Sequence, residues 1–139
     1  MTTVLIDTGP LVAAIDRRDQ WHEWSNRHVG QSPAPLLTCE SVLSEAWFLL
    51  RSTDIGRRSL LDLLERGAVQ VGFSLQGHLP RVVELIRRYA NVPMSLADGC
   101  LVRMSETIPD SVVVTLDSDF RIYRRNRRQI IPLLTPPDV

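Results

Sequence analysis

Short apolar runs alternate along the chain with longer segments in which apolar side chains recur at helical spacing. Runs rich in branched residues predict buried strands at residues 3–6, 36–38, 69–73, 112–115 and 130–134. Helical spacing predicts helices at residues 11–15, 21–28, 39–51, 54–65, 75–89 and 95–106. Loops or turns are expected at 31–35 and 91–93, and a loop with a short helix at 117–128. Strands that alternate with helices indicate an α/β fold whose mostly parallel sheet is covered on both faces.

Local signals mark several helix ends. Pro10 suits a first helical turn, so the first strand ends at about Asp7 and a helix follows directly. Ser95 and Asp98 form a Ser-x-x-Asp capping pattern, and Gly67 stops the helix that precedes it. We find no repeat, low-complexity segment or linker, so one domain over residues 1–139 is predicted.

The triplet Asp7-Thr8-Gly9 after an apolar run is also the signature of an aspartic protease. That class of protein is nearly all-β, and its triplet lies in a loop between strands. Here Pro10 and a helical pattern follow the triplet instead. The alternation of strands and helices therefore weighs against a protease, and Asp7 is interpreted as the end of a parallel strand.

Composition is ordinary for a soluble globular protein, with 44% hydrophobic and 23% charged residues. No apolar run approaches the ~20 residues that a membrane span needs, and no signal-peptide pattern is present. Cys39 and Cys100 lack metal-ligand spacing and fit a reducing compartment. We expect a cytoplasmic protein with no membrane partner.

All 16 basic residues are arginines, and this absence of lysine excludes several classes of site. A Walker-type phosphate loop and Schiff-base chemistry both require a lysine. Receiver-type and haloacid-dehalogenase-type phosphotransfer sites also normally place one beside their aspartate. The formal net charge is zero, so nucleic-acid binding would have to depend on local patches.

Carboxylates stand at positions where a charge is costly or where ligands bind. Asp7 and Asp117 follow two predicted strands, and ligands of parallel sheets bind beyond the carboxyl ends of strands. Glu45 has apolar neighbours one helical turn away, and Asp98 borders an apolar helix face. Each acid has an ordinary structural explanation, as a helix cap, a surface residue or part of a polar turn. Together they are the oxygen-only donors that Mg²⁺ or Mn²⁺ prefers.

Other residues offer weaker candidates. Glu40 competes with Glu45, but it lies in a first helical turn where a negative charge suits the helix dipole. Asp119 is a further acid after the fourth strand. The three histidines are scattered and form no zinc motif, and no GxSxG elbow supports a hydrolase triad.

With these positions identified, the chain resembles the PIN-domain family, and within it the VapC-type toxin ribonucleases of type II toxin–antitoxin systems. The resemblance covers nearly the whole chain. It rests on the order and spacing of four blocks: VLIDTGPLVAAID, ESVLSEAWFLL, SLADGCLVRMSE and VVVTLDSDFRIYRRNRRQIIPLL. It implies a three-layer α/β/α domain with a central, mostly parallel sheet, and an acidic pocket that binds Mg²⁺ or Mn²⁺. It also implies cleavage of single-stranded or looped RNA, inhibition by a small antitoxin protein, and a homodimer formed by the apolar N-terminal helices.

The resemblance also assigns roles to individual residues. The family's acidic quartet, which is catalytic and binds the metal, matches Asp7, Glu45, Asp98 and Asp117. Asp119 matches a second acid that is often present, and Thr8 and Thr115 match small hydroxyl residues near the site. A non-catalytic PIN-like RNA-binding or regulatory module is the alternative interpretation.

An arginine cluster lies near the end of the chain. Arg121, Arg124, Arg125 and Arg128 have the spacing of one helix face, with Arg127 beside them. The cluster is either a solvated charged face or a surface that binds the RNA backbone or acidic groups of an antitoxin. The tryptophans Trp21, Trp24 and Trp47 are interpreted as core or interface residues.

Overall fold

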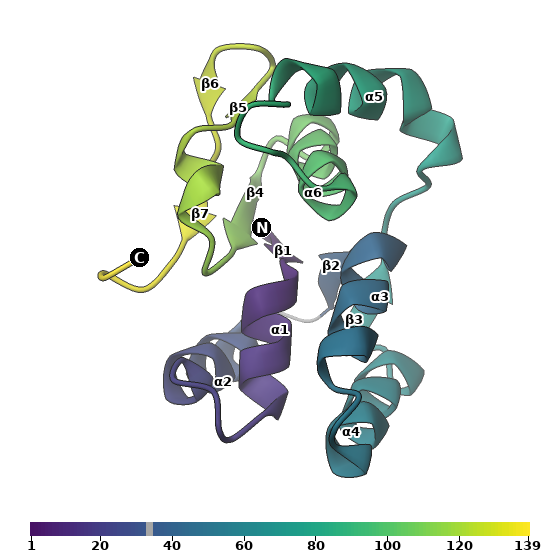
Figure 1. Cartoon of the computed structure of the whole chain (residues 1–139), viewed down its shortest axis with the longest axis vertical. Helices are drawn as coiled ribbons and strands as arrows, with labels where there is room; N and C mark the ends of the chain where they lie inside the picture. Colours follow the sequence, from purple (N-terminus) through teal and green to yellow (C-terminus); the bar gives the residue numbers. More distant parts are fainter. Residues whose placement is uncertain (33–34) are drawn as a thin grey trace.

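The computed structural model describes residues 1–32 and 35–139, and it contains a five-stranded sheet in which every neighbouring pair is parallel (Figure 1). The strands lie in the order β3-β2-β1-β4-β7. Their bounds are β1 Thr3–Ile6, β2 Leu36–Thr38, β3 Val69–Val71, β4 Ser111–Val114 and β7 Leu133–Leu134. The predicted α/β class with a parallel central sheet is thus confirmed.

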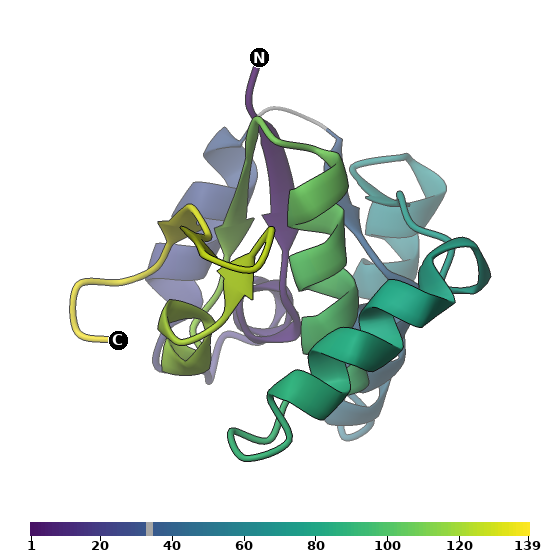
Figure 2. The ribbon, with the colours of Figure 1, turned by 90° about the horizontal axis from the view of Figure 1, so that it is seen from above.

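In the part of the chain that the structure describes, six helices and two short 3-10 turns surround the sheet. The helices are α1 Thr8–Ile15, α2 His22–Gln31, α3 Glu40–Leu49, α4 Asp54–Glu65, α5 Leu79–Arg88 and α6 Leu96–Thr107. The 3-10 turns are η1 Gln76–His78 and η2 Ser118–Arg121. Figure 2 shows α5 and α6 on one side of strands β1 and β4 and α2 on the other side. No helix in the described ranges is long and apolar enough to cross a membrane.

The core forms where the central strands are covered on both faces. Leu5 and Ile6 of β1 and Val113 of β4 have no exposed surface, which explains why these strands are continuous apolar runs. The two strands pair in register from Thr3 opposite Ser111 to Ile6 opposite Val114. Their carboxyl ends therefore lie side by side, and so do the residues that follow them.

The predicted helix starts are confirmed by hydrogen bonds. Asp7 is the N-cap of α1, and its side chain accepts a hydrogen bond from the backbone N–H of Thr8. Ser95 caps α6 by accepting a hydrogen bond from the N–H of Asp98. Both capping residues line the candidate site, so helix capping fixes the positions of two of its acids, Asp7 and Asp98.

Several predicted bounds differ from the structure. The predicted strand 69–73 stops at Val71, and the predicted helix 75–89 divides into η1 and α5. The predicted strand 130–134 is two strands, since β7 joins the main sheet and β6 Gln129–Ile130 does not. Within the predicted loop 31–35, Gln31 ends α2, and residues 33–34 lie outside the described residues.

The arginine-rich segment is a hairpin. Strand β5 Arg124–Arg125 pairs antiparallel with β6, and the chain reverses between them. Asn126 and Arg127 have φ values of 48° and 73°, in the left-handed region that ends any right-handed helix. The predicted helix face of Arg121, Arg124, Arg125 and Arg128 is therefore wrong.

Candidate functional site

A cavity of about 580 Å³ opens at the carboxyl ends of β1 and β4. Asp7 directly follows β1, and Asp117 follows β4 after two residues. The acids that line this cavity come from four separate parts of the chain: Asp7, Glu45, Asp98, Asp117 and Asp119. The structure thus brings every predicted acidic residue to one place. Glu40 is exposed in the first turn of α3 and is not among the described residues that line the cavity.

Asp7 is held rigidly at the bottom of this cavity. Its carboxylate accepts hydrogen bonds from the N–H of Thr8 at 2.8 Å and from the hydroxyl of Thr115 at 2.7 Å. Only 6% of its surface is exposed. Burial raises the pKa of Asp7 to about 7, opposed by the Thr115 hydrogen bond and reinforced by the negative charges of Asp98 and Asp117.

Two threonines connect the acids in pairs. Thr115 donates its hydroxyl proton to Asp7 and accepts a 3.0 Å hydrogen bond from the N–H of Asp117. Thr8 donates its hydroxyl proton to Oε1 of Glu45 at 2.8 Å, while its N–H binds Asp7. The structure therefore places the two predicted hydroxyl residues in direct contact with the acids.

Asp98 has a partner that the sequence analysis missed. Oδ2 of Asp98 accepts a 2.8 Å hydrogen bond from the hydroxyl of Tyr123, which is fully buried. The Tyr123 ring packs edge-on against Tyr89 and Phe120, with centroids 5.1 and 5.2 Å away. A tyrosine in an arginine-rich segment carries no local signal for this contact, because the contact depends on how the segment folds back onto α6.

Burial also perturbs the protonation of this pair. It raises the pKa of Asp98, and the neighbouring charge of Asp117 adds to the effect while the Tyr123 hydrogen bond opposes it. Burial and the bond to Asp98 raise the pKa of the Tyr123 phenol. Tyr123 therefore stays protonated at neutral pH and remains a hydrogen-bond donor to Asp98.

The remaining acids form the accessible side of the cavity. Glu45 and Asp117 are exposed, and Asp119 is half-buried. Oδ1 of Asp117 accepts a 2.9 Å hydrogen bond from the N–H of Asp119, which orients this turn. Exposed carboxylates can rotate toward a ligand without disturbing the core, whereas Asp7 and Asp98 cannot.

The donor set fits a hard divalent cation. The cavity offers carboxylate and hydroxyl oxygens. Burial raises the pKa of Asp7 and Asp98, and repulsion from the neighbouring acids adds to this effect. A cation between them would relieve that repulsion. Among residues 1–32 and 35–139, however, no three acidic, histidine or cysteine side chains are grouped so that they could hold a metal ion as they stand.

The predicted RNA-binding arginines lie outside the cavity. Arg121 donates to the carbonyl of Val139, and Arg124 donates to carbonyls of its own segment. Arg125 donates to the carbonyls of Ser105 and Pro109, and Arg128 is exposed. Three of the four guanidinium groups are thus engaged with the protein's own backbone.

Comparisons with known proteins match the chain to one family and one fold. The family model of the PIN domain matches residues 4–126. The crystal structure of VapC20 from Mycobacterium tuberculosis, described as a Sarcin-Ricin loop cleaving toxin, has a TM-score of 0.77 and 19% identity. That match covers 94% of this chain and 100% of the other. No curated protein sequence gives a significant match.

A second solved structure is similar over most of its length. The crystal structure of VapBC2 from Rickettsia felis, bound to a DNA fragment from their promoter, has a TM-score of 0.60 and 16% identity. The match covers 96% of this chain and 98% of the other. At these identities, the two structures establish a shared fold.

Proposed function

The chain belongs to the PIN-domain family, and on that premise we propose that it is a divalent-metal-dependent endoribonuclease, the toxin of a VapBC-type toxin–antitoxin pair. One observation carries the proposal: Asp7, Glu45, Asp98 and Asp117 line one cavity at the carboxyl end of the sheet. The likeness of the fold to VapC20 and VapBC2 supports it.

We assign Asp7, Glu45, Asp98 and Asp117 as ligands of Mg²⁺ or Mn²⁺, with Asp119 as a further oxygen donor. When bound, such an ion lowers the pKa of a water molecule and neutralises charge on the phosphodiester. Thr115 and the N–H of Thr8 hold the Asp7 carboxylate in one orientation, so it is organised before substrate arrives.

Two further residues of the site hold acidic side chains in position. Tyr123 orients Asp98, and Thr8 orients Glu45. In-line attack of water on phosphorus, with departure of the 3′ oxygen, would leave 5′-phosphate and 3′-hydroxyl ends. Asp119 lines the same cavity, and we assign it the role of orienting the attacking water.

Cleavage of a defined RNA pool tests this function. The purified protein should cleave RNA when Mn²⁺ or Mg²⁺ is supplied, and cleavage should stop when a chelator is added. Glu45→Gln and Asp98→Asn should each lower the cleavage rate by at least about 100-fold while circular dichroism stays unchanged. Glu40→Gln is the matched control, because it removes an exposed carboxylate from the same helix α3. Equal cleavage by wild type, Asp98→Asn and chelator-treated protein would refute the proposal.

A non-catalytic PIN-like RNA-binding or regulatory module is the second candidate. The lack of a ready-made group of three metal-binding side chains in the described residues favours it. It predicts RNA binding that is independent of divalent ions, without cleavage. Sequencing of RNA ends after brief expression distinguishes the two, since only an endonuclease creates new ends at defined positions.

We also propose a small antitoxin partner, by analogy with the VapBC2 assembly. A cavity of about 850 Å³ between α1, α2 and α4 offers a suitable surface. Its lining combines apolar and basic side chains: Ile15, Val29, Ile55, Leu63, Arg17, Arg58 and Arg66. This chemistry suits an acidic amphipathic segment. Co-purification with the product of the neighbouring gene, and its loss in Arg58→Glu, would test the assignment.

We also propose a homodimer, on a surface other than the predicted one. The predicted surface was the N-terminal helices, yet no large hydrophobic side chain on α1 or α2 is exposed in the described part of the chain. The exposed apolar side chains of α3 are Trp47, Phe48 and Leu49, at 39%, 58% and 51%. We therefore place the self-association surface on α3. Light scattering tests this surface by comparing the molar masses of wild type and Phe48→Glu. The charge introduced on α3 should convert a dimer into a monomer.

A further inference from the structure

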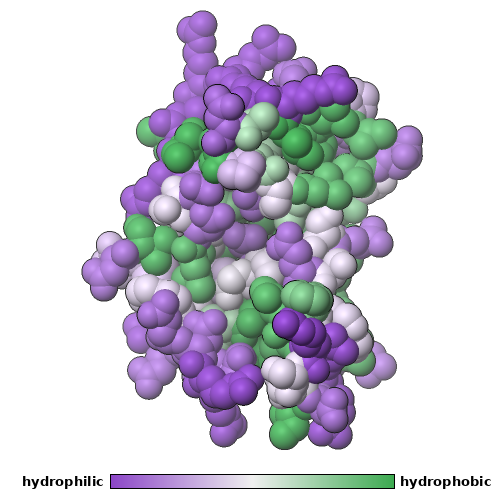
Figure 3. Space-filling view, viewed as in Figure 1, coloured by the Kyte–Doolittle hydropathy of each residue, from purple (hydrophilic) through white to green (hydrophobic). Residues whose placement is uncertain are grey.

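Positive charge is concentrated in two segments of a chain whose net charge is zero. Helix α5 and residues 121–130 together contain a single acid, Glu84. Against it stand eight arginines: Arg81, Arg87, Arg88, Arg121, Arg124, Arg125, Arg127 and Arg128. Figure 3 shows strongly hydrophilic side chains along the edge of the molecule formed by α5 and the β5–β6 hairpin. An excess of this kind is the electrostatic footprint of a surface that meets a polyanion.

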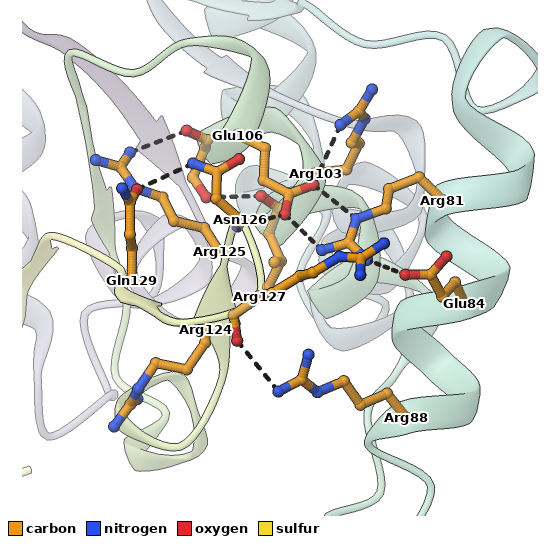
Figure 4. A network of polar contacts seen from close by, with 12 residues as sticks. Arg81, Glu84, Arg88, Arg103, Glu106, Arg124, Arg125, Asn126, Arg127 and Gln129 are labelled. Atoms are coloured by element: carbon orange, nitrogen blue, oxygen red, sulfur yellow. Dashed lines mark hydrogen bonds and ion pairs between the residues drawn. The ribbon is translucent and has the colours of Figure 1, made fainter.

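Specific contacts hold the two segments side by side. The guanidinium of Arg88, on α5, donates a 3.1 Å hydrogen bond to the carbonyl of Arg127 in the hairpin turn (Figure 4). Glu106, whose side chain is 2% exposed, accepts a 2.7 Å hydrogen bond from the N–H of Asn126. A buried acid thus anchors Asn126, the first of the two left-handed residues of this turn, a backbone conformation that costs energy outside glycine.

The acids of this region are already paired. Glu106 also binds the guanidinium groups of Arg81 and Arg103, and Glu84 binds Arg81. Four exposed arginines form what we call the arginine patch: Arg87, Arg88, Arg127 and Arg128. Within the described residues, none of the four makes an ion pair. The contact between Arg88 and Arg127 therefore brings two arginine-rich segments together, and no ion pair in the described part of the chain neutralises these four exposed guanidinium groups.

The patch is connected to the acidic cavity through two aromatic rings. The Arg88 guanidinium lies 5.4 Å from the centre of the Tyr89 ring, and that ring lies 5.1 Å from the Tyr123 ring. The hydroxyl of Tyr123 binds Asp98 in the cavity wall. Three successive side-chain contacts thus lead from Arg88 of the patch to Asp98 of the cavity, so the patch and the cavity belong to the same part of the molecule.

We propose that the arginine patch binds the sugar–phosphate backbone of RNA outside the cleaved bond. This inference rests on the proposed ribonuclease function and deepens it, because it assigns a second contact surface to the substrate. Guanidinium groups bind phosphate oxygens in pairs of hydrogen bonds, and each neutralised phosphate releases counterions. The proximity of the patch to the cavity favours RNA over an acidic protein as its ligand.

The test compares Arg87→Gln/Arg127→Gln with wild type, using a labelled single-stranded RNA of about 20 nucleotides. Binding is measured by fluorescence anisotropy in chelator at several salt concentrations. The double variant should bind about 10-fold more weakly at low salt, and the slope of log K against log salt should fall by about 0.7 for each lost phosphate contact. Arg18→Gln/Arg27→Gln is the matched control, since it removes two exposed arginines of the α1–α2 region that line neither the acidic cavity nor the proposed antitoxin cavity.

Cleavage by the same variants separates this inference from the proposed function. With Mn²⁺, the double variant should show a higher KM for long RNA, an unchanged rate on a dinucleotide, and recovery in Arg87→Lys/Arg127→Lys. If wild type cleaves RNA but the double variant binds it as wild type does at every salt concentration, the patch is not an RNA surface. Loss of antitoxin binding with intact RNA binding would overturn the inference in the same way. If wild type neither binds nor cleaves RNA, the proposed function itself fails.

Discussion

The hydroxyl of Tyr123 donates a 2.8 Å hydrogen bond to Oδ2 of Asp98, although 25 residues separate the two in the chain. Asn126, three positions further along the hairpin, donates its N–H to Glu106 at the other end of α6. The β5–β6 hairpin is thus fastened to α6 at two points. One of these points is an acid of the candidate site, and the other is a buried ion-pair network.

Removal of the Tyr123 hydroxyl should affect the metal site more than the fold. Tyr123→Phe leaves Asp98 without its buried donor, so we expect about a 10-fold loss of Mn²⁺ affinity by calorimetry and a loss of stability of about 1 kcal/mol. Tyr89→Phe is the matched control, because the Tyr89 hydroxyl accepts a hydrogen bond from the N–H of Arg124 and does not bind Asp98. Equal Mn²⁺ affinities of the two variants would contradict a positioning role.

Stability without metal should fall as the pH rises from about 4 to about 7. The pKa of Asp7 is raised from 3.8 to about 7 in the folded state, so over this range the unfolded chain ionises the group and the folded chain keeps it protonated. The folded state thus loses stability with rising pH, on the order of a few kcal/mol, and Asp98 adds in the same direction. Urea denaturation in chelator measures this slope. Asp7→Asn should flatten it, and an unchanged slope would show that Asp7 is not its source.

Divalent ions should stabilise the folded chain. An ion that binds only the native state adds about 2.7 kcal/mol at 100 times its dissociation constant, so Mn²⁺ should raise the melting temperature of metal-free protein. The increase should disappear in Asp7→Asn, shrink in Glu45→Gln and persist in Glu40→Gln. A rise of the same size in all four proteins would mean that the ion binds elsewhere.

Glu106 should contribute far more to stability than Glu84, although both bind Arg81. Burial by itself would raise the pKa of Glu106, but the hydrogen bonds from Arg81 and from the N–H of Asn126 hold it below its usual range. Loss of the Glu106 charge leaves the guanidinium groups of Arg81 and Arg103 without their buried counter-charge and weakens the bond to the N–H of Asn126. Glu106→Gln should therefore lower the free energy of unfolding by about 3 kcal/mol, measured by urea denaturation at pH 7. Glu84→Gln should cost less than about 1 kcal/mol, since Glu84 is an exposed partner. Similar losses for the two variants would argue against the anchoring role of Glu106.

The acids of the candidate site were predictable because each leaves a local mark in the sequence. Asp7 and Asp117 follow apolar strands, and Ser95 and Asp98 form a capping pattern at a helix start. Parallel pairing of β1 with β4 then brings the first two together. Glu45 was distinguished from Glu40 by its apolar neighbours, and the structure places Glu45 and not Glu40 at the cavity.

The last third of the chain shows the limit of such reasoning. The spacing of Arg121, Arg124, Arg125 and Arg128 suits a helix, but the left-handed residues Asn126 and Arg127 reverse the chain there. The N–H of Asn126 donates a hydrogen bond to Glu106, an acceptor twenty residues away in sequence. Local propensity carries no information about such a partner, because the partner approaches only after α6 has packed.

The sequence by itself determined the alternation of strands and helices and the set of acids, because hydrophobic periodicity and helix capping act over a few residues. Only the tertiary structure decided which side chains meet: Thr8 with Glu45, Thr115 with Asp7, and Tyr123 with Asp98. It also decided that the arginines of α5 and of the hairpin share one surface. These contacts join residues far apart in the chain, and their geometry depends on packing around a common core, which no local pattern encodes.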